Sequence, residues 1–198
     1  MSGHKKRVIR REKYKMAFWS DGQKGADPKR QYRFVVDIGG KIVKYVVKKT
    51  DKPSFAISEA EHKYLNHTYY YPGRVSWNAI TVTLVDQGGD DDTALMLSSI
   101  IEASGYRPHQ ASGDKANQGL ATISKKSAVE TLGSVTIEQI DSDGAPVEKW
   151  TLKNAWINDV KYGDLAYDGD DLVEVTISLR YDWAELDVTG SKVWKVGT

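Results

Sequence analysis

The sequence of 198 residues contains no cysteine, so the chain forms neither a disulfide nor a thiolate–metal site. No apolar run approaches the roughly 18 residues of a membrane-spanning helix, so we expect no membrane partner. The basic N-terminus is not followed by an apolar segment, which predicts that it is not a secretory signal. With 40% hydrophobic and 28% charged residues, the composition is typical of one soluble globular domain with an extension.

Common catalytic and nucleotide-binding motifs are absent as well. There is no H-E-x-x-H, no G-x-S-x-G, no P-loop and no G-x-G-x-x-G. His62 and His67 are five residues apart, which is poor spacing for two ligands on one helix face, so we interpret them as surface residues. The segment 141–144 starts like a calcium loop, but Pro146 and Leu152 stand where Gly and Glu are required. We therefore expect no catalytic residue, no metal and no cofactor.

The net charge of +1 conceals a strong asymmetry along the chain. Residues 1–52 contain 16 Lys or Arg and 5 Asp or Glu, whereas residues 53–198 contain 12 and 22. This split predicts a basic arm that contacts an acidic surface. Nucleic acid is the alternative partner, but the acidic remainder argues against a broad nucleic-acid-binding face. The candidate contacts of this basic N-terminal arm are Lys5, Lys6, Arg7, Arg10 and Arg11.

Apolar residues alternate with polar ones over much of the remaining chain, and this period of two predicts β-strands. Runs on either side of Gly39-Gly40 indicate a β-hairpin, and a second hairpin surrounds residues 141–144. The longest regular run, 172–183, offers its backbone edge to any neighbour. The predicted strands are 32–38, 43–47, 75–86, 134–140, 147–157 and 172–183, with short ones near 165–167 and within 188–198.

Two segments depart from this alternation. Residues 90–105 have helical spacing, with Asp91 or Asp92 as the N-cap, and form the one helix that we predict. Residues 49–74 show no clean periodicity and predict a long loop rich in tyrosine, a residue favoured at interfaces. The predicted fold class is mainly β: an antiparallel β-sandwich or partly open barrel with one flanking α-helix.

Three stretches stand out by their order and spacing. Residues 49–53 read KTDKP, residues 73–86 read GRVSWNAITVTLVD, and LKNAW at 152–156 leads towards YDW at 181–183. Together with the order of the elements, they resemble the tail tube proteins of contractile-tailed bacteriophages of the T4-like type. The resemblance covers about residues 30–186.

The resemblance implies a tail-tube (Hcp-like) fold and a structural, non-enzymatic role in the virion tail, which is assembled in the host cytoplasm. Tube proteins of this kind form six-fold rings whose sheets join in one inner barrel, and the rings stack into a hollow tube. The implied partners are other copies, the tail sheath protein, the tape-measure protein, and the baseplate and tail-terminator proteins. DNA passes through the lumen without specific binding, and an acidic lumen would repel its phosphates.

The resemblance also gives particular residues a role. Strand 172–183 is expected to pair its edge with another copy, and the basic arm to bind the next ring or the sheath. The loop 49–74 is expected to pack on the adjacent ring through Lys49, Lys52, Pro53, Phe55, Tyr64, Tyr69, Tyr70 and Tyr71. The face expected to line the inner barrel carries Glu174, Thr176, Ser178 and Arg180.

We divide the chain into a basic N-terminal arm and linker (1–27), a tail-tube β domain (28–187) and a C-terminal extension (188–198). The two outer segments look like additions to the core of the family. They leave open whether the chain is the main tube subunit or a baseplate tube initiator. An Hcp-like tube of a secretion system is a further alternative, and a monomeric β-sandwich binding domain or an enzyme is the remote one.

Overall fold

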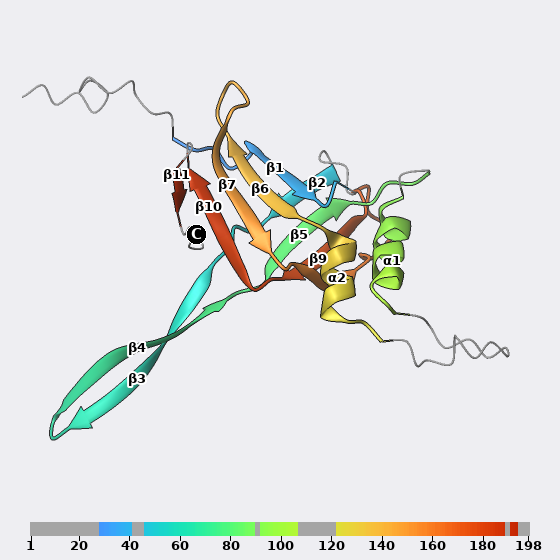
Figure 1. Cartoon of the computed structure of the whole chain (residues 1–198). Coiled ribbons are helices and arrows are strands. Elements are labelled where there is room, and N and C mark those ends of the chain that lie inside the picture. The colour runs from blue at the N-terminus through green and yellow to red at the C-terminus, as the bar shows by residue number, and fades with distance from the viewer. Residues whose placement is uncertain (1–27, 41–45, 90–91, 107–121, 189–190, 194–198) are drawn as a thin grey trace, which may run out of the picture.

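A computed structural model describes residues 28–40, 46–89, 92–106, 122–188 and 191–193. Two antiparallel sheets form the body, two helices cover one side of it, and a long two-stranded hairpin projects from it (Figure 1). The predicted fold class, mainly β with antiparallel sheets, is confirmed, and the sheets do not close into a barrel within this chain.

The two sheets of the body draw their strands from distant parts of the sequence. The five-stranded sheet has the order β1 (Phe34–Ile38), β6 (Val135–Ile140), β7 (Pro146–Lys153), β10 (Trp183–Val188) and β11 (Ser191–Val193). The four-stranded sheet has the order β2 (Val47–Thr50), β5 (Ile80–Val85), β9 (Glu174–Arg180) and β8 (Trp156–Lys161). The projecting hairpin consists of β3 (Phe55–Tyr64) and β4 (His67–Trp77). The helices are α1 (Thr93–Ala103) and α2 (Lys125–Leu132).

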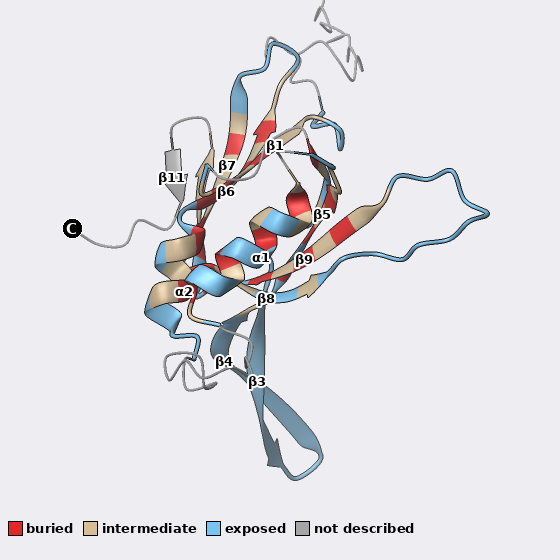
Figure 2. Cartoon of the chain, turned by 90° about the vertical axis from the view of Figure 1, so that its right-hand side faces the viewer, coloured by how far each residue is buried: buried red, intermediate tan, exposed pale blue. Residues whose placement is uncertain are grey.

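One hydrophobic core contains side chains from both sheets and both helices. The alternation that predicted β9 puts Val175, Ile177 and Leu179 into this core, where none of them is accessible to solvent. Fully burying such a side chain contributes roughly 1.5–3 kcal/mol. Figure 2 shows the resulting separation, with buried residues inside the body and exposed ones on its outer faces and on the hairpin.

The predicted helix is confirmed as α1, and a second helix was missed. The carboxylate of Asp92 caps α1 by accepting a hydrogen bond from the backbone N–H of Leu95 at 2.7 Å. The missed helix α2 is only eight residues long and buries only two of them. Its detectable signals were the N-cap Ser124 and Gly133, which follows the last turn with φ of 78°.

Four strand predictions were wrong because the chain changes sheets where we expected it to continue. Among the described strands, Gly39-Gly40 does not join a hairpin, since β1 pairs with β6 and β2 pairs with β5; residues 43–45 of the expected second strand lie outside the described residues. The run 172–183 divides after Arg180 into β9 and β10, and the run 147–157 divides at Asn154 into β7 and β8. The run 75–86 divides after Trp77, so that its start belongs to β4 and the rest to β5. Alternation identifies the face of each residue, but it does not identify the partner strand.

Two smaller predictions had opposite outcomes. The short strand expected within 188–198 is confirmed as β11, which pairs with β10. The short strand expected near 165–167 was wrong, because residues 162–173 contain no helix or strand. The division of the chain at residues 27 and 187 stays a prediction.

Gly39 is required by a close backbone approach. It has φ of 59°, and a Cβ built there would lie 2.0 Å from the carbonyl oxygen of Leu132. Gly40 has a similar φ of 65°, but a Cβ there meets nothing within 4 Å. We expect Gly39→Ala to lower the free energy of unfolding by about 3 kcal/mol, and Gly40→Ala by about 1 kcal/mol. Urea unfolding of both variants measures the difference, and equal losses would contradict the close approach.

Candidate assembly interface

The hairpin β3–β4, residues 55–77, is the most exposed element of the fold, and we call it the arm (Figures 1 and 2). Every residue of β3 is exposed, as is every residue of β4 except Trp77. This finding corrects the predicted loop, since most of 49–74 is a regular hairpin. A two-stranded hairpin is marginally stable alone in water. Its exposed apolar side chains are Phe55, Ile57, Tyr64, Leu65, Tyr69, Tyr70, Tyr71 and Val75.

The pairing register gives the outer half of the arm two chemically different faces. Cross-strand partners share a face, and successive residues alternate between faces. The pairs Ala60↔Tyr71, His62↔Tyr69 and Tyr64↔His67 therefore lie on one side, which we call the aromatic face. The pairs Glu59↔Pro72, Glu61↔Tyr70 and Lys63↔Thr68 lie on the other, which we call the charged face. The register thus separates Tyr70 from Tyr64, Tyr69 and Tyr71.

A bulge in the middle of the arm changes the direction of the side chains in its outer half relative to those at its base. The register shifts between Ile57 and Glu59, where β4 has one extra residue. The backbone N–H of Arg74 donates to Oγ of Ser58 at 2.8 Å. Gly73 allows this approach, because a Cβ there would lie 2.3 Å from the same Oγ.

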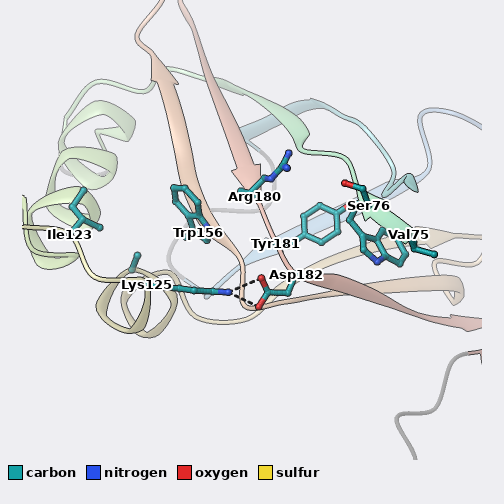
Figure 3. A pocket seen from close by; sticks show the side chains of 10 residues that line it. Val75, Ser76, Ile123, Lys125, Trp156, Arg180, Tyr181 and Asp182 are labelled. Atoms are coloured by element: carbon teal, nitrogen blue, oxygen red, sulfur yellow. Dashed lines mark hydrogen bonds and ion pairs between the residues drawn. The ribbon is translucent and has the colours of Figure 1, made fainter. Parts of the chain in front are cut away.

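The base of the arm is fixed to the body by aromatic contacts. The ring of Trp77 lies 5.2 Å from that of Phe55 and 5.8 Å from that of Tyr181, measured between centroids. Beside them is an open cavity of about 710 Å³, lined by residues of β4, α2, β8 and the β9–β10 junction (Figure 3). Across it, Lys125 pairs with Asp182 at 2.7 Å, and Asn154 donates to the same carboxylate at 2.8 Å. The hydrogen bonds from Lys125 and Asn154 lower the pKa of Asp182.

A buried carboxylate joins the two sheets just beyond the C-terminal end of β2, where Lys52 follows the strand. Glu148 on β7 is only 7% exposed, and it accepts hydrogen bonds from Lys29, Lys52 and the indole of Trp150. Lys52 also donates to the side chain of Gln139 at 2.6 Å. Burial alone would raise the pKa of Glu148, but these hydrogen bonds outweigh it and lower the pKa to about 2.

This cluster predicts acid sensitivity of the fold. Because the folded-state pKa of Glu148 is about 2 and the ordinary value is 4.5, ionised Glu148 stabilises the fold above pH 4.5. That contribution is lost as the pH falls from 4.5 towards 2. We expect Glu148→Gln to cost about 2 kcal/mol of unfolding free energy at pH 7, a value discounted because both lysines are half-exposed. The variant should also change less than the wild type between pH 5 and pH 3.

Urea unfolding at pH 7, 5 and 3 measures this difference. Glu138→Gln is the matched control, because Glu138 pairs with Lys149 at 2.6 Å on the outer face of the same sheet. The same pH profile in the wild type and Glu148→Gln would contradict the assigned role of the cluster.

The residues expected to contact another ring have different positions in the structure. Lys49 is exposed on β2, and the four tyrosines lie on the arm. Phe55 packs on Trp77 at the base. Pro53 is buried, so its prediction as a surface contact was wrong, and Lys52 is held by Glu148 and Gln139 of its own chain. The basic contacts Lys5, Lys6, Arg7, Arg10 and Arg11 lie outside the described residues.

The expectation that strand 172–183 pairs its edge with another copy was wrong. Its first part, β9, is hydrogen-bonded to β5 on one side and to β8 on the other, both in the same chain. Its polar side chains do share the outer face of the sheet: Glu174, Thr176, Ser178 and Arg180. Among the described strands, those with only one hydrogen-bonded neighbour in the body are β1, β2, β8 and β11.

Within the part of the chain that the structure describes, no group of three or more His, Asp or Glu side chains is arranged to hold a metal ion. None of the described helices has the length and apolar composition needed to cross a membrane. His62 and His67 share the aromatic face of the arm, and no third ligand joins them among the described residues.

The chain shares its fold with chains of contractile injection systems. A chain from the cryo-EM structure of the anti-feeding prophage cap, the tube-terminating cap, is 15% identical with a TM-score of 0.62, covering 88% of this chain and 100% of that one. A chain from the 6-fold symmetrised anti-feeding prophage baseplate is 15% identical with a TM-score of 0.58, over 82% and 97%. No protein-family model and no curated protein sequence matches the chain.

A chain from the extended sheath–tube complex of the PVC extracellular contractile injection system is 17% identical with a TM-score of 0.56, covering 82% of this chain and 93% of that one. At these identities the likeness shows the fold alone. It confirms the tube-like fold that the sequence resemblance implied.

Proposed function

We propose that this chain is a structural subunit of a bacteriophage tail tube, without enzymatic activity. Six copies form a ring, rings stack, and the lumen conducts DNA during ejection. The observation that carries the proposal is the arm, a regular hairpin whose tyrosines are 50–61% exposed. Side chains of this kind, gathered on a projecting hairpin that lacks a core of its own, favour burial against another copy.

The strand edges of the body suit closure into a ring. Each sheet ends in two strands that have only one partner among the described residues, and exposed strand edges invite pairing with further copies. Joining edges around a ring removes them, as in a closed barrel. In this arrangement the arm of each copy packs on the adjacent ring through its aromatic face.

The outer face of β9 is the candidate channel lining. It carries Thr176 and Ser178 beside Thr81 and Thr83 of β5, so it is polar. Glu174 at one end is paired with Lys48, and Arg180 stands at the other. This face is polar with mixed charge, as the residues expected to line the inner barrel indicate. A polar surface without a cationic cluster suits the passage of DNA without specific binding.

The other partners follow from the same proposal. The sheath protein would contact the outside of the tube, the tape-measure protein would occupy its lumen, and baseplate and terminator proteins would bind its ends. The basic residues Lys5, Lys6, Arg7, Arg10 and Arg11 would bind an acidic surface of the next ring or of the sheath. The protein would then be found in the virion tail, after assembly in the host cytoplasm.

A second candidate is a baseplate tube initiator or a tube component of a secretion or injection system. It is favoured by the likeness to chains from baseplate and cap structures. The two candidates differ in whether both ring faces accept identical rings.

Sedimentation velocity of the full chain over a range of concentrations tests the proposal. We expect hexamers and larger multiples of them, and a variant in which residues 59–72 are replaced by a two-residue turn should remain small. A wild-type protein that stays monomeric at every concentration, alone and with preformed baseplates, would overturn the proposal.

A further inference from the structure

The connection between β8 and β9, residues 162–173, is a second exposed segment with unusual chemistry, and we call it the acidic loop. Residues 162–172 are all exposed, and Figure 2 shows this connection extending away from the body between β8 and β9. Its apolar side chains Leu165, Tyr167 and Leu172 are 87%, 112% and 71% exposed. It contains no Lys, Arg or His, and it carries four carboxylates: Asp164, Asp168, Asp170 and Asp171.

This loop is longer than most connections in compact domains, which have about 4–6 residues, and long loops often have a functional role. A loop that served only to connect two strands would bury its larger apolar side chains or lack them. This one presents three apolar side chains among four negative charges. The partner that fits it has apolar walls and lysine or arginine side chains at its rim.

The described surface offers such a partner between β1 and β2, which we call the lysine groove. It has a volume of about 970 Å³, and Phe34, Val47 and Trp150 are among its apolar lining residues. Glu138 is the one carboxylate among the lining residues that the structure describes. Each of β1 and β2 has a single hydrogen-bonded neighbour among the described strands, so an extended segment can also meet backbone groups there. The lysines that line it are Lys29, Lys48, Lys49 and Lys52.

The acidic loop does not fill the groove of its own chain. Lys48 lines the groove and also lines a second cavity next to the loop. There it pairs with Glu174, which follows the loop. The loop extends away from the body, and its Asp168 and Asp170 are exposed. Within one chain, Lys48 of the groove forms an ion pair with Glu174, the residue that follows the loop. We expect the same kind of lysine–carboxylate pair between the groove and the loop of different copies.

We infer that the acidic loop of one copy binds in the lysine groove of a second copy. The charges are complementary: the loop carries four carboxylates, and four lysines line the groove, of which Lys29 and Lys52 also pair with Glu148, and Lys48 with Glu174, in the same chain. Apolar side chains face apolar walls on both sides. Loop and groove are different surfaces, so a contact that repeats from copy to copy builds a ring or a filament. The inference rests on the proposed self-assembly and names one of its contacts.

Charge exchange between two variants of the full chain tests this contact. The loop variant is Asp168→Lys with Asp170→Lys, and the groove variant is Lys48→Glu with Lys49→Glu. The loop variant loses the net negative charge of the loop, and the groove variant loses the net positive charge of the groove. In each variant alone we therefore expect self-association to weaken at least about tenfold. Mixed in equal amounts, the unchanged loop of the groove variant meets the unchanged groove of the loop variant, and association should return. Sedimentation velocity at low and high salt measures both effects, and the restored association should weaken with salt.

The controls separate this contact from other causes. Lys126→Glu, on the exposed side of α2 with its side chain 83% exposed, should leave association unchanged. Circular dichroism shows whether each variant is folded. Unchanged association of both variants alone, or no association in the mixture, would overturn the inference. If all four substitutions in one chain restore association but the mixture does not, the pairing is intramolecular, and the inference is likewise overturned.

Failure of the tube proposal gives a different result. Mixed variants that associate into small, salt-sensitive oligomers, while the wild type never forms rings or tubes, would support the loop–groove contact and contradict the tube. Wild-type tubes that persist in both charge variants would support the tube and contradict the contact.

Discussion

Replacing Tyr69 and Tyr71 together by alanine is expected to abolish ring stacking while the chain stays folded. Both side chains lie on the aromatic face of the arm and are 50% and 57% exposed, so the body does not depend on them. A tyrosine at the centre of an interface commonly contributes about 2 kcal/mol, so the double variant should weaken each contact by about 10³-fold. Light scattering against protein concentration measures the shift in the concentration at which assembly begins.

The register provides a matched control on the same two strands. Thr68→Ala with Tyr70→Ala removes a tyrosine of similar exposure, 60%, from the charged face. This variant disturbs the cross-strand pairs of the arm to a similar degree, so it separates arm stability from contact with a partner. We expect a shift of less than about tenfold. Equal shifts in the two double variants would show that the arm does not dock by its aromatic face.

Ile177→Ala is expected to destabilise the folded chain strongly. Ile177 lies in the middle of β9, is inaccessible to solvent and belongs to the shared core of the two sheets. Removing three carbons from such a site costs about 3 kcal/mol, because it loses buried surface and leaves a cavity. For a chain of this size that corresponds to a fall of about 10 °C in Tm.

The neighbouring residue is the control for this substitution. Thr176 lies one position earlier on the same strand, with its side chain on the outer face. Thr176→Ala should change the unfolding free energy by less than about 1 kcal/mol. Thermal unfolding of both variants tests whether the alternation in β9 separates core from surface, and similar losses in the two would contradict the architecture.

The elements with one buried face and one solvent-exposed face were predictable from the sequence. β5 and β9 each alternate between core and solvent, and α1 shows helical spacing after the N-cap Asp92. The arm was missed because both of its faces are exposed, so no alternation marks it. The run Tyr69–Tyr71, which has high strand propensity, was the signal that a strand was present.

The sheet changes were missed for a different physical reason. The apolar residues alternate in the sequence through Trp183, but around Tyr181 the chain turns from one sheet into the other, and the buried positions shift by one, so that Trp183 is exposed and Ala184 is buried. A corner of this kind is common where strands of packed sheets cross at a large angle. It is fixed by long-range contacts, such as the hydrogen bond from the N–H of Asp182 to the carbonyl of Lys153 at 3.0 Å.

The candidate interface was only partly predictable. Tyrosine content and length drew attention to residues 49–74, but the sequence did not separate Pro53, which is buried, from the exposed tyrosines. Glu148 was also missed, although it stands four residues before Leu152, on the same inward face of β7. A carboxylate at an inward strand position needs cationic partners, and here Lys52 is one of them.

Electron microscopy of the purified protein in negative stain tests the central claim most directly. We expect end views with six-fold symmetry and side views of hollow tubes that lengthen with protein concentration. Rings that never stack would favour the initiator over the tube subunit. Small particles without rings, alone and after mixing with preformed baseplates, would contradict the account of this chain as a tube protein.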